Sequence, residues 1–467
     1  MLMKKTIVFL CLVLIKNLLP AQSDSSKILS LDEFYEIIST YHPMAKQAAL
    51  LVEKGKKQLR SSRGEFDPKV YSTLSEKDFK DKNYYNIQET GVKIPTWYGI
   101  TLKTAYERNT GIFLNPENNV PGEGLGVFGA EITLGKGLFI DERRANLRKA
   151  QIYRESSLME RELLLNNLYF EATVSYWDWV VSYRNLQTYN EAISFSQLRF
   201  EGIKNSFLGG DLPAIDTLEA FIQLQDVQLS YITAQSDFIN SLNKLSVFLW
   251  DENESPIILD QQIVPPTDFE NLKPEEFNLI SNNLDSYIEN HPKVKILDYK
   301  RSSLVIDKRL KAEKLKPSVD LNYNFITTDY NTKFTTNDFK WGFKFGIPLF
   351  LREGRGALAV AKIKIQDNEY SRLFFTTDIK NKVTAQLNQI ENLINQFEQY
   401  SELIKGYSRL LSTEEVKFQI GESSMFKVNA RQLKLLNTQV KANKQLGKLY
   451  QSRGKLYKEM GILHLNP

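Results

Sequence analysis

Over most of its length the chain mixes apolar and charged residues without the breaks that end helices. Residues 141–208 contain no proline and one glycine, which predicts a single helix about 100 Å long at 1.5 Å per residue. Residues 213–249 predict a second helix of roughly 55 Å. Helices of this length occur in coiled coils, membrane spans and repeats, and the many charges exclude a membrane span. We therefore expect soluble rods that pack against other rods.

This long-helix region occurs twice in the sequence. Residues 138–250 align without a gap on residues 349–461, at a constant offset of 211 positions. Matching positions include Phe139/Phe350, Arg144/Arg355, Leu147/Leu358, Ala150/Ala361, Ile152/Ile363, Tyr189/Tyr400, Ile193/Ile404, Gly210/Gly421, Leu224/Leu435, Gln228/Gln439, Lys244/Lys455 and Leu245/Leu456. One inserted residue would rotate every later side chain by about 100°, so the ungapped register indicates rigid elements of fixed length. Each copy predicts a long helix, a glycine-marked turn and a second helix.

A shorter helical unit precedes each copy. Ser30 and Glu33 predict a capping box for a helix over residues 31–41, and His42-Pro43 ends that helix and begins another that runs to about Gly64. The pattern returns 249 positions later, where Asn290-His291-Pro292, Arg309 and Pro317 match Tyr41-His42-Pro43, Arg60 and Pro68. We interpret both histidines as helix-boundary residues rather than metal ligands. Because the offset falls from 249 to 211, the first half carries 38 extra residues between Pro68 and Leu138.

The stretches that follow Pro68 and Pro317 alternate instead with a period of two. Phe339, Trp341, Phe343 and Phe345 alternate with polar or small residues, and residues 319–325 show the same pattern. This length and pattern are typical of a membrane-spanning strand whose apolar face meets lipid, although a soluble hairpin is the alternative for one such pair. Further candidate strands in the longer first half are residues 70–78, 87–94, 99–108 and 127–137.

The N-terminus indicates export from the cytoplasm. Residues 1–21 combine Lys4-Lys5, an apolar run over residues 6–15 and Ala21, as a secretory signal does; ten apolar residues are too few for an anchor, which needs about 20. Loss of the signal's three lysines lowers the formal net charge from +4 to +1, so the charge gives no support to a nucleic-acid partner. The single cysteine, Cys11, lies in the signal, so we expect no disulfide. No later stretch reaches the length of an apolar membrane helix.

Three features favour membrane strands over a soluble hairpin. The signal exports the chain, the apolar side is rich in aromatic residues as barrel girdles are, and two strands per half cannot close a barrel without oligomerisation. Residues 95–98 alone separate the second and third candidate strands, whereas residues 109–126 separate the third and fourth. Short turns on one side and long loops on the other are typical of outer-membrane barrels.

Motifs that suggest chemistry lack the structural context that the chemistry needs. Gly124-x-Gly126-x-x-Gly129 precedes a predicted strand, whereas dinucleotide binding needs a helix there. Gly135-Lys136-Gly137 lacks the spacing of a phosphate-binding loop. We interpret Asp141-Glu142 as helix-terminal acids, and His464 stands alone. With no nucleophile–base pair or metal-ligand set in the sequence, we expect no enzyme activity, cofactor or metal.

Taken together, these features resemble the TolC-family outer-membrane efflux proteins. The resemblance rests on the two-half repeat, the His-Pro break, the Leu-Phe strand ending before Asp141-Glu142-Arg143-Arg144-Ala145, and the turn at 208–220 with its weaker echo at 418–428. It covers residues 28–461 and implies a homotrimer, with one shared β-barrel in outer-membrane lipid and a hollow α-barrel across the periplasm. It also implies two partners, a periplasmic adaptor (membrane fusion) protein and an inner-membrane pump.

The resemblance implies roles for the two turns. The residues implied at the adaptor-contacting tips are Gly209, Gly210, Asp211, Pro213, Gly421, Glu422, Ser423 and Ser424. Those implied at a periplasmic gate are Asp216, Glu219, Lys427, Met425 and Phe426. We expect Asp216 and Lys427 to alternate in sign around the narrowest point; the alternative is that both point away from the lumen.

The sequence departs from the family pattern in two ways. The family usually has four strands per protomer, whereas six candidates are present here. The best-known members carry acidic residues six and nine positions after the glycine of the second turn, where this chain has Lys427 and Ala430. An all-acidic gate in the second repeat is therefore not expected.

The expected fold class is mostly α with a membrane β-barrel portion, built from long helical hairpins in two pseudo-repeats that form a trimeric α-barrel. The expected segments are the signal 1–21; a first repeat 22–250, with helices 31–64, strands 70–137 and helices 141–250; a connector 251–273; and a second repeat 274–467, with helices 274–315, strands 319–348 and helices 352–461. The leading function is a passive outer-membrane exit channel of a tripartite efflux or type I secretion system. The alternative is a secreted or periplasmic coiled-coil scaffold or adhesin without transport.

Overall fold

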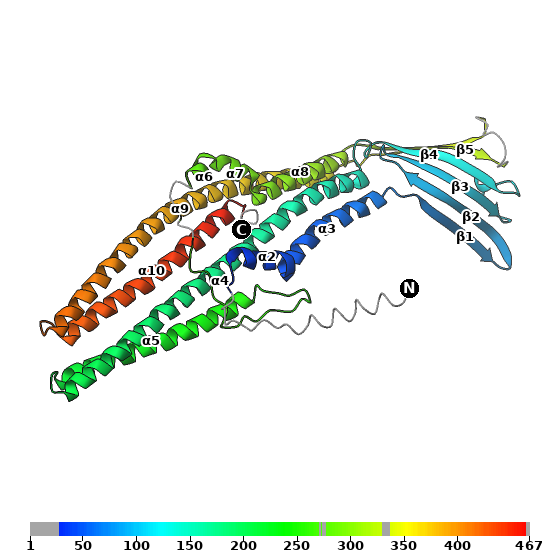
Figure 1. Ribbon diagram of the computed structural model, residues 1–467. Coiled ribbons are helices and arrows are strands. Elements are labelled where there is room, and N and C mark those ends of the chain that lie inside the picture. The colour runs from blue at the N-terminus through cyan, green and yellow to red at the C-terminus, as the bar shows by residue number, and fades with distance from the viewer. Residues whose placement is uncertain (1–27, 270–271, 273–276, 329–336, 464–467) are drawn as a thin grey trace, which may run out of the picture.

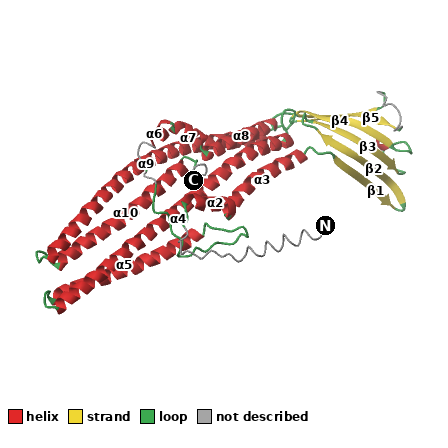
Figure 2. Cartoon of the chain, viewed as in Figure 1, coloured by secondary structure: helices red, strands yellow, loops and turns green. Residues whose placement is uncertain are grey.

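The computed structural model describes residues 28–269, 272, 277–328 and 337–463, and the predicted signal and His464 lie outside them. The molecule is elongated, with long helices over most of its length and an antiparallel sheet at one end (Figure 1). The chain runs through short helices to the sheet, leaves it along a long helical hairpin and then repeats this path (Figure 2). A mostly helical fold with paired long helices in two repeats and an antiparallel sheet is thereby confirmed.

Each half uses the same order of elements. The first half contains α2 (Leu31–Tyr41), α3 (Pro43–Gly64), β1 (Lys69–Phe79), β2 (Lys82–Pro95), β3 (Ile100–Thr110), η2 (Pro116–Asn118), β4 (Leu125–Gly135), α4 (Glu142–Leu208) and α5 (Ala214–Ser246). The second half contains α6 (Asn278–Asn282), α7 (Leu284–Asn290), α8 (Pro292–Glu313), β5 (Ser318–Thr327), β6 (Phe339–Gly346), α9 (Arg352–Gln419) and α10 (Met425–Glu459). The long helices α4 and α9 have 67 and 68 residues, so each is about 100 Å long.

A histidine caps the helix that begins at each His-Pro junction. His42 Nδ1 accepts a hydrogen bond from the Met44 N–H at 3.1 Å, and His291 Nδ1 accepts one from the Lys293 N–H at 3.0 Å. The proline that follows each histidine has no N–H, and the first helical position needs none. Both histidines are buried. The equivalent positions in the two halves therefore begin α3 and α8 by the same local chemistry.

The six strands lie in one antiparallel sheet, in the order in which they occur in the chain. The predicted bounds of the first two strands, 70–78 and 87–94, are too short. β1 and β2 continue to a two-residue turn at Lys80 and Asp81, which have φ angles of 54° and 58°. This turn lies at the same end of the sheet as the long β3–β4 connection, so the short and long connections are not separated by side as the sequence suggested.

Apolar clusters hold the helices together at intervals along the rod. The largest surrounds Trp179, Tyr176 and Phe34 and joins α2, α4, α5, α9 and α10. The connector contributes Phe269, whose ring lies 4.9 Å from that of Trp177. Smaller clusters lie toward the sheet and toward the tips. The rod is thus held by separated contacts rather than by one globular core.

The His291 cap predicts a loss of stability in acid. Burial, with a smaller contribution from Lys293, lowers the pKa of His291 from 6.5 to about 4. The unfolded chain then binds the proton first, so the stabilisation is complete above pH 6.5 and is lost as the pH falls from 6.5 toward 4. The expected loss is up to about 3 kcal/mol. His291→Asn keeps a capping oxygen without a titrating group, so its unfolding midpoint should fall less steeply than the wild-type midpoint between about pH 7.5 and 4. Identical pH profiles for the two proteins would contradict this account.

Candidate functional site

The sheet has one apolar face and one charged face, because neighbouring residues of a strand point to opposite sides. Cross-strand partners share a side, so the registers define each face. The apolar face carries Val70, Leu74, Leu102, Tyr106, Phe128, Ile132, Leu321, Tyr323, Phe339, Trp341, Phe343 and Phe345. The four residues predicted to face lipid lie together on β6 and are 47–61% exposed in the single chain. The helices α2 to α10 do not cover this face (Figure 1).

The opposite face carries cross-strand ion pairs. Lys103 pairs with Glu89 at 2.7 Å, and Lys340 pairs with Glu107 at 3.6 Å. Lys93 lies 3.9 Å from Glu131. The outer strands β1 and β6 have no second strand partner in the described part of the chain. A sheet with an apolar face, a charged face and two open edges is suited to the wall of a membrane barrel that surrounds a polar lumen.

The two helix turns at the far end of the rod have the same backbone structure. Gly210 and Gly421 have φ angles of 86° and 80°, a region that glycine adopts without strain. The Asp211 N–H donates to the Ser206 carbonyl at 2.9 Å. The Glu422 N–H donates to the Lys417 carbonyl at 2.8 Å, again at the offset of 211. Most of the predicted tip residues are exposed: Gly209, Gly210, Asp211, Pro213, Gly421, Glu422 and Ser424; Ser423 is half-buried.

The structure places the predicted gate residues in different environments. Asp216 and Glu219 are half-buried on α5, whereas Phe426 and Lys427 are exposed at the start of α10. Met425 is fully buried against α4 and α5. The side chain of Met425 thus fills the core of the tip in this conformation, and its role at the gate stays a prediction.

The starts of α5 and α10 lie side by side, at the matching height that the repeat predicts. The Asn429 side-chain amide donates to the Glu219 carbonyl at 3.4 Å. Asp216 and Lys427 nevertheless form no ion pair within the described part of one chain. The acid that Lys427 influences is Glu414, whose pKa is lowered first by a hydrogen bond from Ser423 and further by Arg431 and Lys427.

A polar cluster above the tips joins the two hairpins, and sequence reasoning missed it. Arg199 of α4 pairs with Glu415 of α9 and donates to Gln432 of α10, and Gln432 donates to Ser196 at 3.2 Å. Burial lowers the pKa of Arg199, and Glu415 opposes that change. The repeat offers no signal for this cluster, because position 410, which corresponds to Arg199, is a leucine.

The motifs that suggested other chemistry are structural. Gly126 and Gly129 lie within β4, and Asp141 caps α4 by accepting from the Arg144 N–H at 2.8 Å. Within the described ranges, no group of three His, Cys, Asp or Glu side chains is arranged to hold a metal ion. None of the described helices combines the length and apolar character needed to cross a bilayer.

The whole fold matches solved outer-membrane channels. The Campylobacter jejuni CmeC outer membrane channel is 15% identical with a TM-score of 0.62, and the match covers 95% of this chain and 90% of that one. CusC is 14% identical with a TM-score of 0.66, covering 95% of each chain. The open state of the Neisseria gonorrhoeae MtrE channel is 12% identical with a TM-score of 0.63, covering 92% and 88%. No protein-family model and no curated protein sequence matches. These likenesses establish the fold.

The two sheet faces predict responses of different size to a new charge. Trp341→Arg places a cation on the apolar face and should destabilise the assembled protein by about 2–4 kcal/mol if the position lies near the bilayer midplane. Asn322→Arg places the same cation on the charged face of the adjacent strand and should have a much smaller effect. Denaturant unfolding of both variants in lipid vesicles measures the difference. Equal destabilisation would show that the apolar face does not meet lipid.

Proposed function

We propose that this chain, which has the fold of the TolC-family outer-membrane channels, is the outer-membrane channel of a tripartite efflux or type I secretion system. It would act as a passive exit duct that crosses the outer membrane and extends into the periplasm. The observation that carries this proposal is a sheet with one apolar and one charged face, joined directly to helices about 100 Å long. An exposed apolar sheet face of this kind does not fit a water-soluble scaffold or adhesin. Recovery of the protein from the soluble periplasmic fraction, without detergent, would contradict the proposal.

The duct requires assembly, and the edges of the chain support a homotrimer. Along the rod, α4 packs on α10, α5 packs on α4 and α9 packs on α10, and α5 also meets α10 near the tips. Both α5 and α9 present exposed apolar side chains: Leu218, Ile222, Leu229 and Ile232 on α5, and Leu403 and Leu410 on α9. A cyclic arrangement would bury the α5 edge of one chain against the α9 edge of the next. It would also pair β6 with β1 of the next chain, and three chains of six strands would give eighteen.

The distance of a residue from the tip, counted along its helix, predicts which residues meet across this interface. Leu229 lies 15 residues after the start of α5, and Leu403 lies 16 residues before the end of α9, so both are about 23 Å above the tip. Leu229→Cys combined with Leu403→Cys should give a covalent trimer on oxidation. Leu229→Cys combined with Leu373→Cys is the matched control, since Leu373 is exposed on α9 but about 45 Å farther from the tip. A gel under denaturing conditions distinguishes the species, and equal cross-linking of both pairs would refute this arrangement.

The tips are the proposed contact for a periplasmic adaptor protein, and an inner-membrane pump would supply the energy. Exposed Gly210 and Gly421 have no heavy atom within 4 Å of the position of an added Cβ. The surrounding tip residues are small or turn-forming, so another helical hairpin could approach the backbone closely. Two hairpin tips per chain would give six contact positions in a trimer.

The charged residues that begin α5 and α10 support an electrostatic gate. Asp216 and Lys427 are each the third residue of their helix, and three copies of both would form a ring of alternating sign. Pairing between chains would close the ring. Exposed pairs of this kind contribute about 0–1 kcal/mol each, so a docked partner could open the ring at low energetic cost.

Single-channel conductance tests this gate. Asp216→Ala and Lys427→Ala should each raise the conductance of the purified protein and weaken its dependence on salt, because each removes one partner of the ring. Asp216→Lys combined with Lys427→Asp should restore the closed level. Asp211→Ala, which removes an exposed acid from the turn itself, is the matched control. Unchanged conductance in both single variants would show that the charged ring is not the gate, and exposed Phe426 would become the candidate.

A further inference from the structure

A groove with four cationic side chains in its lining lies between α3 and α4, toward the sheet end of the rod. Its volume is about 480 Å³, and its charged lining comprises Lys56, Arg60, Arg63, Arg154 and Glu155. The three cations of α3 are spaced by four and three residues, so they lie on one face of the helix. Val52, Leu59 and Leu158 provide an apolar lining. The groove thus offers both positive charge and apolar surface.

The positive charge of this groove is largely uncompensated. Lys56, Arg60 and Arg63 form no ion pair with any residue that the structure describes. Arg154 pairs with its neighbour Glu155, which leaves three cations facing the groove without an acidic partner. Arginine side chains bind phosphate and carboxylate groups through paired N–H donors. An anionic ligand therefore fits this lining.

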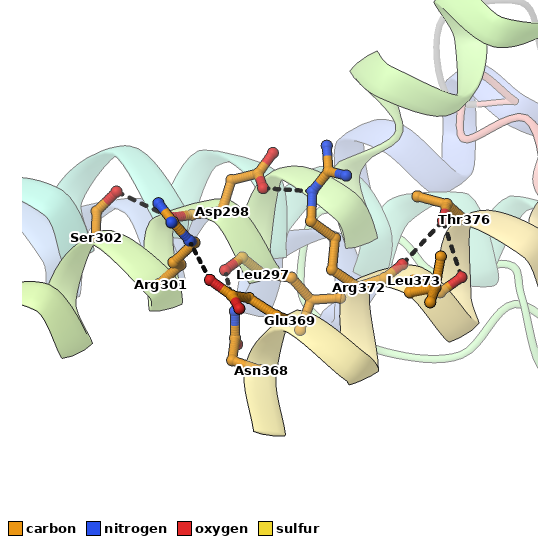
Figure 3. A network of polar contacts seen from close by, with 9 residues as sticks. All are labelled: Leu297, Asp298, Arg301, Ser302, Asn368, Glu369, Arg372, Leu373 and Thr376. Atoms are coloured by element: carbon orange, nitrogen blue, oxygen red, sulfur yellow. Dashed lines mark hydrogen bonds and ion pairs between the residues drawn. The ribbon is translucent and has the colours of Figure 1, made fainter. Parts of the chain in front are cut away.

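The corresponding place in the second half of the chain, between α8 and α9, is filled by ion-paired side chains. At the same repeat offsets, Val305, Ala312 and Ile365 stand where the first half has Lys56, Arg63 and Arg154. The counterparts of Val52 and Leu158 are Arg301 and Glu369, which form an ion pair of 3.2 Å between α8 and α9 (Figure 3). Asp298 and Arg372 add a second pair of 2.7 Å in the same network. The groove is consequently a feature of the first half and not a general result of the fold.

One end of the groove approaches the junction between the helices and the sheet. α3 ends at Gly64, so Arg63 and Arg60 lie within about one 5.4 Å turn of its end. Two residues beyond, Phe66 stacks on Trp97 with ring centroids 4.9 Å apart, and Trp97 is 54% exposed. Exposed tryptophan is typical of the membrane–water interface, and the headgroup layer extends about 5–8 Å beyond the hydrocarbon. A bilayer interface at Trp97 would place Arg63 and Arg60 in or next to the headgroup layer.

We propose that this groove binds the phosphate headgroup of an anionic phospholipid from the leaflet that faces the helices. Arg60 and Arg63 would hold the phosphate, Lys56 and Arg154 would meet the distal part of the headgroup, and Trp97, which lies between the groove and the sheet, would contact the apolar part of the lipid. The site rests on the proposed outer-membrane location. The nearby exposed Trp97 distinguishes a lipid from free phosphate, which would gain nothing from it.

Thermal unfolding of the detergent-purified full-length oligomer tests the site with short-chain phosphatidylglycerol as the probe. Phosphatidylglycerol should raise the unfolding temperature saturably, whereas phosphatidylcholine and inorganic phosphate should not. Arg60→Gln combined with Arg63→Gln should weaken the apparent affinity by about tenfold or more. Arg309→Gln is the matched control, because Arg309 is the repeat counterpart of Arg60 outside the groove; it should leave the affinity unchanged.

A second variant tests the groove without removing its cations. Val52→Arg combined with Leu158→Glu would install the ion pair that fills the counterpart between α8 and α9, and it should abolish the phosphatidylglycerol effect while the oligomer remains folded. Equal responses to phosphatidylglycerol and phosphatidylcholine would overturn the proposal. So would a response to soluble cell-wall peptide fragments without one to lipid. Planar-bilayer conductance of the same variants separates the two proposals, because failure of lipid binding with normal conductance leaves the channel function intact.

Discussion

The unpaired backbone groups at the edges of the sheet are the constraint on which the rest of the structure depends. β1 and β6 have no outer partner in the described part of the chain, and unsatisfied N–H and C=O groups are not tolerated in lipid. The proposed closure by identical copies would satisfy them, and it would also place the charged sheet face around a lumen. The same cyclic contact would bury the apolar edges of α5 and α9, so barrel and rod would be closed by one assembly step.

Much of this architecture could be predicted from the sequence, because rods and alternating strands leave periodic signals. The constant offset of 211 reproduces the hydrogen bonds of both tips, including Asp211 to Ser206 and Glu422 to Lys417. The two-residue turn at Lys80 and Asp81 was missed because neither residue is the glycine or asparagine that usually marks positive φ. The burial of Met425 and the Arg199 cluster were missed because both depend on contacts between hairpins that are far apart in sequence.

The two halves share a backbone plan but differ in the side chains between their helices. Between α8 and α9, Arg301–Glu369 and Asp298–Arg372 join the helices by ion pairs. Between α3 and α4, Gly55 allows close approach, since an added Cβ would lie 2.6 Å from Ser157 Oγ. Beside that contact remains the basic groove. A repeat therefore predicts where equivalent elements lie, but it does not predict which of them carries a site.

An electron cryomicroscopy map of the detergent-extracted oligomer tests the central claim most directly, because it counts the strands and helices around one axis. The account predicts three chains, a closed barrel of eighteen strands in which β6 of one chain pairs with β1 of the next, and a continuous lumen lined by the Lys103–Glu89 face. A sheet that closes within one chain, or a map in which the edges of β1 and β6 remain open in the micelle, would contradict it.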